Sequence, residues 1–139
     1  MAQDDLVIDP WGSAQSTDYD RIIEQFGLTS MTGVSLSNPS KLHRRGIVFA
    51  HRDVDQVVEA QRTGSPFGVL TGLMPSGQMH LGHSMVVEQA RWFQENGGDV
   101  TIAVADLESQ ATRGVSLSKG REVALREYIC LLYTSPSPR

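Results

Sequence analysis

FGVLTGLMPSGQMHLGH, residues 67–83, is the stretch of sequence that decides the fold. Its first part, Phe67–Leu70, is a short apolar run behind a proline that ends at Thr71-Gly72, which predicts a buried strand. Residues 73–78 contain a proline, a serine and a glycine, which predicts a loop. The stretch therefore passes from a strand, through a loop, into whatever element begins at Met79.

That element is predicted to be a helix over residues 79–96. Its apolar side chains recur at helical spacing, and Gly97-Gly98 is a stop signal. The stripe consists of Met85, Val86, Ala90 and Phe93. A second apolar strand is predicted at Val100–Ala105, followed by a loop and by a helix capped by Ser116 or Ser118. This repeated order predicts an α/β fold with a parallel sheet and right-handed crossovers.

The region upstream of the first predicted strand is expected to form its own segment, residues 1–65. Thr17 or Asp18 is placed to cap a helix that runs from Tyr19 to Phe26 and ends at Gly27. Residues 28–40 are rich in Ser, Thr, Gly and Asn, which predicts a surface loop. Asp53 is expected to cap a second helix, with valines on one side, that ends near Gly64.

Composition narrows the class of protein. The chain has 139 residues, of which 40% are hydrophobic and 20% charged, as in an ordinary soluble domain. Its formal net charge of −4 argues against uniform wrapping of a nucleic acid. It has no apolar run of about eighteen residues and no secretory signal pattern at its start, so we expect a cytoplasmic protein without a membrane contact. Cys130 is the only cysteine, so no internal disulfide forms.

The last ten residues, CLLYTSPSPR at positions 130–139, differ from the amphipathic helix predicted over residues 121–129. They carry no charge until Arg139, and they resemble the translation of a transposase-type sequencing adapter. We therefore expect a non-native tail at 130–139, with the natural gene continuing past Ile129. The alternative is an ordinary terminal helical turn with a Ser-Pro end.

His80 and His83 carry the chemistry that we expect of this chain. They lie three apart at the start of a helix that follows a strand, where backbone N–H groups and the helix dipole favour phosphate. Both imidazoles can donate to one polyphosphate from a shared helix face. Gly82 leaves backbone exposed for a flat base, while Gly72 and Gly77 let the chain turn closely around a ligand. Donors held in place there would stabilise the charge that develops when a carboxylate attacks phosphorus.

Other interpretations of these residues stay open. Two histidines at this spacing are also half of a metal site, but no cysteine pair or third histidine lies nearby, so we expect no metal ligands. They are also compatible with a partly exposed helix face. Asp106 and Glu108 follow the second strand at the same sheet edge, where a carboxylate can hold an ammonium or indole N–H, or simply cap a helix. A cationic cluster suits contact with a tRNA acceptor end or with ATP phosphates, or a solvated face. Its members are Lys41, His43, Arg44, Arg45, His51 and Arg52.

His80-Leu81-Gly82-His83 resembles the HIGH motif of class I aminoacyl-tRNA synthetases. The longer pattern, Thr-Gly-x-x-Pro-Ser-Gly-x-Met-His-x-Gly-His, is similar to tryptophanyl members of archaeal and eukaryotic type. The similarity continues upstream and covers almost all of residues 6–129. Its upstream parts are DPW at 9–11, DYD at 18–20, FG at 26–27 and RRGIVFAHRD at 44–53.

This resemblance implies that residues 66–129 are the first part of a Rossmann-type ATP-binding catalytic domain, with residues 1–65 as an N-terminal extension packing on it. The full-length enzyme would activate tryptophan with ATP and Mg²⁺, transfer it to tRNA(Trp), and form a homodimer. The implied catalytic residues are His80 and His83, and the implied amino-acid-binding residues are Glu108 and Asp106. The implied ATP site comprises Gly72, Pro75, Ser76, Gly77, His80, Leu81, Gly82 and His83.

Three positions depart from the pattern that the resemblance implies. Leu70 stands where many relatives have tyrosine, Leu73 where many have arginine, and Ala103 where many have glutamine. Amino-acid specificity is therefore the part left open, and a tyrosyl-tRNA synthetase is the nearest alternative. A small nucleotidyltransferase with an HxGH motif and a non-catalytic paralogue that binds tRNA or a partner are further alternatives. The chain has no KMSKS-type loop or anticodon-binding domain, so alone we expect it to be inactive.

Overall fold

The computed structural model describes residues 19–134 of the chain, which divides into two compact units, Met1–Thr63 and Gly64–Arg139. The motif at positions 9–11, the capping residues Thr17 and Asp18, and residues 135–139 of the predicted tail lie outside the described residues.

The first unit is built from short elements. Helix α1 spans Tyr19–Phe26 and ends at Gly27, whose φ of 57° is the left-handed conformation that glycine adopts readily, as predicted. Strand β1, Thr29–Ser30, lies within the predicted loop and pairs antiparallel with β2, Ala50–His51.

Two further helices of this unit begin at caps that involve imidazoles. Helix α2, Lys41–Arg44, has a capping box in which Ser40 and His43 accept each other's backbone N–H. Helix α3, Val54–Thr63, begins where the Nδ1 of His51 accepts the N–H of Val54 at 3.3 Å. The predicted helix is present, with His51 as the acceptor at its start in place of Asp53.

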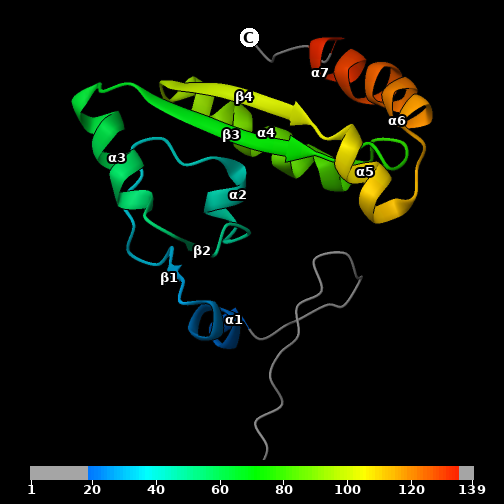
Figure 1. The fold of residues 1–139 in the computed structure, drawn as a ribbon. Helices are drawn as coiled ribbons and strands as arrows, with labels where there is room; N and C mark the ends of the chain where they lie inside the picture. The colour runs from blue at the N-terminus through cyan, green and yellow to red at the C-terminus, as the bar shows by residue number, and fades with distance from the viewer. Residues whose placement is uncertain (1–18, 135–139) are drawn as a thin grey trace, which may run out of the picture. The chain divides into compact units, whose positions relative to one another are not determined.

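The second unit contains the predicted parallel sheet. Strand β3, Phe67–Leu73, leads through a loop into helix α4, Leu81–Glu95, which returns the chain to β4, Gly98–Val104. The strands run side by side in the same direction, with α4 across one face (Figure 1). Their register runs from Phe67 opposite Gly98 to Leu73 opposite Val104, so both carboxyl ends lie at one edge. The predicted α/β class with a parallel sheet is confirmed.

The two faces of this sheet differ. Side chains alternate between half-buried and exposed along both strands, and Leu73 is only 4% exposed. Leu70 lies on the other face and is 75% exposed, beside Thr101 and Ala103 of β4. The predicted buried strand is therefore at least half-buried on one face and exposed on the other.

Helix α4 buries Ala90 of the predicted stripe, and it also buries Trp92, which the stripe did not include. Its buried residues are Ala90 and Trp92, whereas Met85 of the predicted stripe is exposed. Trp92 meets the ring of Phe93 edge-on at 4.9 Å between centroids. Trp92 has the largest apolar ring on this helix and gains most from burial against the sheet. The flexible side chain of Met85 is left in water instead.

Helices continue from the end of β4. Helix α5 spans Asp106–Arg113, where a loop was predicted, and ends at Gly114 with φ 65°. Helix α6, Leu117–Val123, begins at Ser116, whose hydroxyl accepts from Lys119, as predicted. A π-helical stretch, η1, spans Ala124–Ile129, and α7, Cys130–Thr134, follows it.

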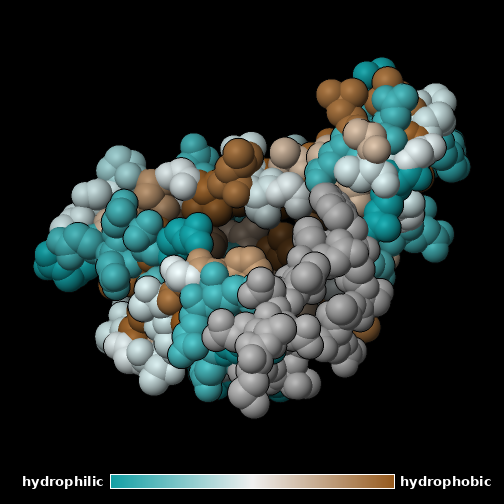
Figure 2. Space-filling model, turned by 60° about the horizontal axis from the view of Figure 1, so that its bottom comes forward, coloured by the Kyte–Doolittle hydropathy of each residue, from teal (hydrophilic) through white to brown (hydrophobic). Residues whose placement is uncertain are grey.

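Large apolar side chains reach the surface in several places. Figure 2 shows them as brown atoms among hydrophilic ones, and Leu70 and Leu81 are among the most exposed. Among the described helices, none is both long enough and apolar enough to cross a membrane.

Candidate functional site

The histidine motif forms a reciprocal cap at the start of α4. His80 is the N-cap residue, with φ −134° and ψ 175°, and its Nδ1 accepts the N–H of Gly82 at 3.1 Å. The Nδ1 of His83 in turn accepts the backbone N–H of His80 at 3.2 Å. This is the geometry of a capping box, with imidazoles in the roles that serine and glutamate usually take. The two residues therefore hold the helix start together before any ligand is considered.

This cap determines which ring nitrogens carry hydrogen. A nitrogen that accepts an N–H cannot itself be protonated, so neutral His80 and neutral His83 each carry their hydrogen on Nε2. Burial lowers the pKa of His83 below its ordinary value and nearby His80 lowers it further, although the backbone hydrogen bond from His80 raises it. His83 is thus held neutral in this arrangement, while His80 is exposed and has its Nε2–H as a further donor.

Gly82 fits closely under the ring of His80. A Cβ at this position would lie 3.0 Å from both Cε1 and Nδ1 of that ring. The bare backbone predicted here is present, and its first neighbour is the imidazole of the same motif. A side chain at Gly82 would push the His80 ring away from its cap.

The loop before the motif is fixed from behind. Pro75 is fully buried, and its carbonyl accepts from the hydroxyl of buried Ser109 on α5 at 3.2 Å. The N–H of Ser76 donates to the carbonyl of Met74 at 2.9 Å. Gly72 and Gly77 do not have positive φ, and their close approach to a ligand stays a prediction.

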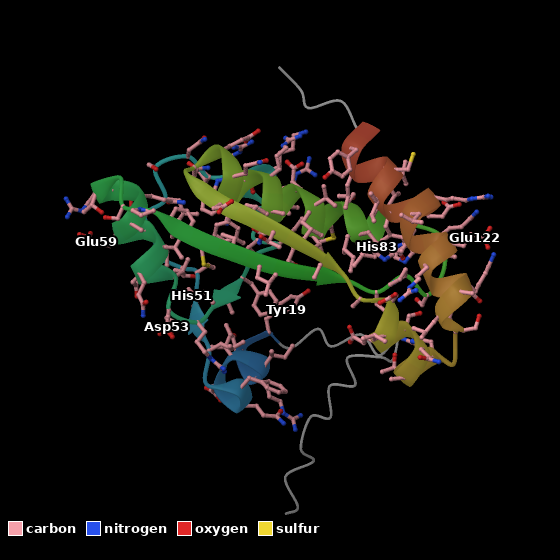
Figure 3. All side chains as sticks on the ribbon, turned by 45° about the horizontal axis from the view of Figure 1, so that its top comes forward. Tyr19, His51, Asp53, Glu59, His83 and Glu122 are labelled. Atoms are coloured by element: carbon pink, nitrogen blue, oxygen red, sulfur yellow. The ribbon has the colours of Figure 1, made fainter. Side chains whose placement is uncertain are left out.

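Tyr128 of η1 contacts the motif from outside it. Its hydroxyl lies 3.3 Å from Nε2 of His83 and 3.2 Å from the carbonyl oxygen of Met74. The two rings meet edge-on at 5.3 Å, and Figure 3 shows His83 on the side of α4 that faces the C-terminal helices. Burial raises the pKa of Tyr128 above its ordinary value, as does nearby Glu127, so the phenol keeps its hydrogen near neutral pH.

The two predicted acidic residues have different surroundings. Asp106 opens α5 at the carboxyl end of β4, and its Oδ2 accepts from Nε of Arg121 at 3.1 Å. Glu108 is exposed on the first turn of the same helix. Both follow the second strand at the predicted edge, but the carboxylate of Asp106 is already paired with Arg121.

The motif, the loop and the start of α5 are therefore brought to one sheet edge. Sequence reasoning missed Ser109 and Tyr128, which hold the loop from 34 and 54 residues away. The sequence predicts Tyr128 only as part of an apolar helix face, and no local pattern marks either contact. Among the described residues, no group of three His, Cys, Asp or Glu side chains is arranged to hold a metal ion.

The cationic cluster of the first unit is partly used in folding. Arg52 donates to the carbonyl of Phe26 at 2.8 Å, and both histidines of the cluster, His43 and His51, accept backbone N–H groups. These three side chains therefore have a structural role in the first unit that requires no nucleic acid.

Comparison with known proteins identifies the family. Residues 62–131 match the family described as tRNA synthetases class I (W and Y). The tryptophan–tRNA ligase of Methanosarcina acetivorans is 44% identical over 130 residues, covering 92% of this chain and 30% of that protein. The chain thus spans about a third of the length of the curated relatives that it matches.

Solved structures agree. The tryptophanyl-tRNA synthetase of Aeropyrum pernix matches with a TM-score of 0.74 at 41% identity, covering 91% of this chain and 36% of that one. The enzyme from Encephalitozoon cuniculi bound to tryptophan matches with a TM-score of 0.66 at 27% identity, covering 79% and 33%. The two strands and α4 thereby correspond to part of a Rossmann-type catalytic domain. With half of its residues matched by the family and its motif at the expected sheet edge, the chain belongs to the class I tRNA synthetases of the tryptophan and tyrosine group, as a homologue of the archaeal-type tryptophan–tRNA ligases.

Proposed function

We propose that this chain carries the ATP-binding part of a tryptophan–tRNA ligase. The observation that carries the proposal is the cap formed by His80 and His83 at the carboxyl edge of two parallel strands. This is the place in a parallel sheet where nucleotides bind. The named relatives are tryptophan–tRNA ligases, and one solved relative has tryptophan bound.

In the full-length protein, a carboxylate oxygen of tryptophan would attack the α-phosphorus of ATP. A new P–O bond forms, the bond to the β-phosphate oxygen breaks, and pyrophosphate leaves with the electron pair. The tryptophanyl group then passes from the adenylate to tRNA(Trp). We propose that His80 donates its Nε2–H to a phosphate oxygen, because its Nδ1 accepts the N–H of Gly82.

Magnesium fits this site as an ion carried by the nucleotide. Mg²⁺ commonly binds through substrate phosphates, waters and one or two carboxylates. Exposed Glu108 is a carboxylate at this edge, although the resemblance gives it to the amino acid instead. When bound, the ion would neutralise phosphate charge. We further propose a homodimer in the cytoplasm for the full-length protein.

Substitution of His80 by serine tests the ATP site. Serine keeps an N-cap acceptor for Gly82 but lacks the Nε2–H, so binding of ATP to the 139-residue chain is expected to weaken about ten-fold. Isothermal titration calorimetry with ATP gives the dissociation constant. His51→Ser is the matched control, because His51 also accepts a backbone N–H at a helix start, and it should leave ATP affinity unchanged.

Absence of ATP binding by the unsubstituted chain, or equal losses in the two variants, would contradict this assignment. Titration of the full-length protein with tryptophan and tyrosine separates the two amino-acid specificities. Leu70, Leu73 and Ala103 are the positions that make the tyrosyl alternative worth measuring.

A further inference from the structure

The hydroxyl of Tyr128 joins the two ends of the predicted phosphate-binding loop. It lies within hydrogen-bond distance of Met74, directly after β3, and of His83, on the first turn of α4. Met74 and His83 are separated by eight residues that include Pro75, Ser76, Gly77 and His80. One atom from a distant helix therefore contacts both ends of the segment.

The direction of each hydrogen bond follows from the groups involved. Nδ1 of His83 accepts from the backbone of His80, so Nε2 carries the hydrogen and donates to the phenol oxygen. A carbonyl oxygen can only accept, so the phenol O–H donates to Met74. The hydrogen bonds thus run in one direction, from His83 to Tyr128 and from Tyr128 to Met74, and no donor faces another donor. It accounts for both ring nitrogens of His83.

The element that supplies Tyr128 is unusual. Residues Ala124–Ile129 form a π-helical stretch between two α-helical ones, and the N–H of Cys130 bonds to the carbonyl of Leu125, five residues earlier. Such stretches are rare and are often found at functional sites. Tyr128 itself is only 1% exposed, and its ring packs edge-on against His83.

We propose that Tyr128 is a positioning residue that clamps the loop and holds the His83 imidazole in its Nε2–H form, with Met74 as the anchor. The clamp fixes the ring that supports the backbone of His80, and so it fixes the direction in which His80 presents its own Nε2–H. Its effect on nucleotide binding rests on the proposed function, whereas the clamp itself does not.

The unsubstituted chain provides the first test. Nitrogen-15 NMR of the histidine side chains at neutral pH should show His83 with a bare Nδ1 and a protonated Nε2 whose hydrogen exchanges slowly with water. A protonated Nδ1, or a rapidly exchanging Nε2 hydrogen, would overturn the clamp. This measurement does not require any variant to fold.

Tyr128→Phe is the second test, because it removes only the hydroxyl. The slow Nε2 hydrogen of His83 should be lost, with exchange at least about ten-fold faster, and amide exchange at residues 76–79 should rise. Tyr133→Phe is the matched control, since Tyr133 lies on α7 with 87% of its side chain exposed, and it should change neither signal. Equal behaviour of the two variants would refute a specific role for Tyr128.

ATP titration separates this inference from the proposed function. We expect Tyr128→Phe to weaken ATP binding about five-fold, as the loss of one neutral hydrogen bond predicts, with no change for Tyr133→Phe. If the exchange results hold while no form of the chain binds ATP, the clamp stands and the ATP site fails. If ATP binds equally to all forms, Tyr128 does not position the site.

Discussion

Replacing Gly98 with alanine is expected to lower the free energy of unfolding of the second unit by about 2 to 3 kcal/mol. Gly98 is buried at the start of β4, opposite Phe67 in the parallel register. A Cβ there would lie 2.8 Å from Cε2 of the Phe67 ring and 3.0 Å from the carbonyl oxygen of Phe93. The ring can turn aside, but the carbonyl belongs to the last turn of α4, so the helix must move.

Urea denaturation measures this loss. Trp92 is 4% exposed in the same unit, so its fluorescence reports unfolding there, and Trp11→Phe removes the only other tryptophan. Gly68→Ala is the matched control on β3, because a Cβ at Gly68 would have no neighbouring atom within 4 Å. The control should change stability by less than about 0.5 kcal/mol. If both substitutions lowered the free energy of unfolding by similar amounts, close packing at Gly98 would not be the cause of its loss.

Acid is expected to weaken both units because imidazoles cap their helices. Burial lowers the pKa of His43, and burial followed by repulsion from His80 lowers the pKa of His83. The folded state therefore binds fewer protons than the unfolded state. Each contribution is present above the unfolded value near 6.5, and it is lost as pH falls from there through the lower folded value. Protonation of Nδ1 also removes the acceptor of each capping box.

The expected loss is at most about 1 kcal/mol for each capping box, since both histidines are partly exposed to solvent. Unfolding free energies measured by urea denaturation from about pH 7.5 to about pH 5 give the profile. His83→Gln supplies the control, because glutamine at this position can still reach back to the N-cap N–H but does not titrate. The second unit of that variant should lose less stability in acid. A profile as steep as that of the unsubstituted chain would assign the acid sensitivity elsewhere.

Local patterns were sufficient to predict the elements that surround the motif. The apolar runs at residues 67–70 and 100–105 identified β3 and β4, and Gly97-Gly98 marked the end of α4. Their order determined the parallel pairing, because a helix between two strands returns the chain to the same end of the sheet. These features depend on neighbours in sequence, which a single chain displays directly.

Other features depend on distant partners and were not predicted. Helix α5 was predicted as a loop because Asp106–Arg113 has little apolar periodicity, yet acidic residues in its first turn and Gly114 after its end favour a helix. The hydrogen bonds from Ser109 and Tyr128 to the loop have no signature in sequence. The division of residues 1–65, 66–129 and 130–139 into extension, domain and foreign tail stays a prediction.

The register of the two strands makes certain substitutions interdependent. Gly72 is the partner of Ala103, and Leu70 lies two residues before Gly72 on the same exposed face. Leu70 and Ala103 are therefore diagonal neighbours, with Gly72 and Thr101 at the other two corners, and a bulky replacement at one changes the room and polarity available to the other. Their effects should be epistatic rather than additive. The amino acid that the sheet tolerates at position 70 therefore depends on the amino acid at position 103, and the reverse holds as well.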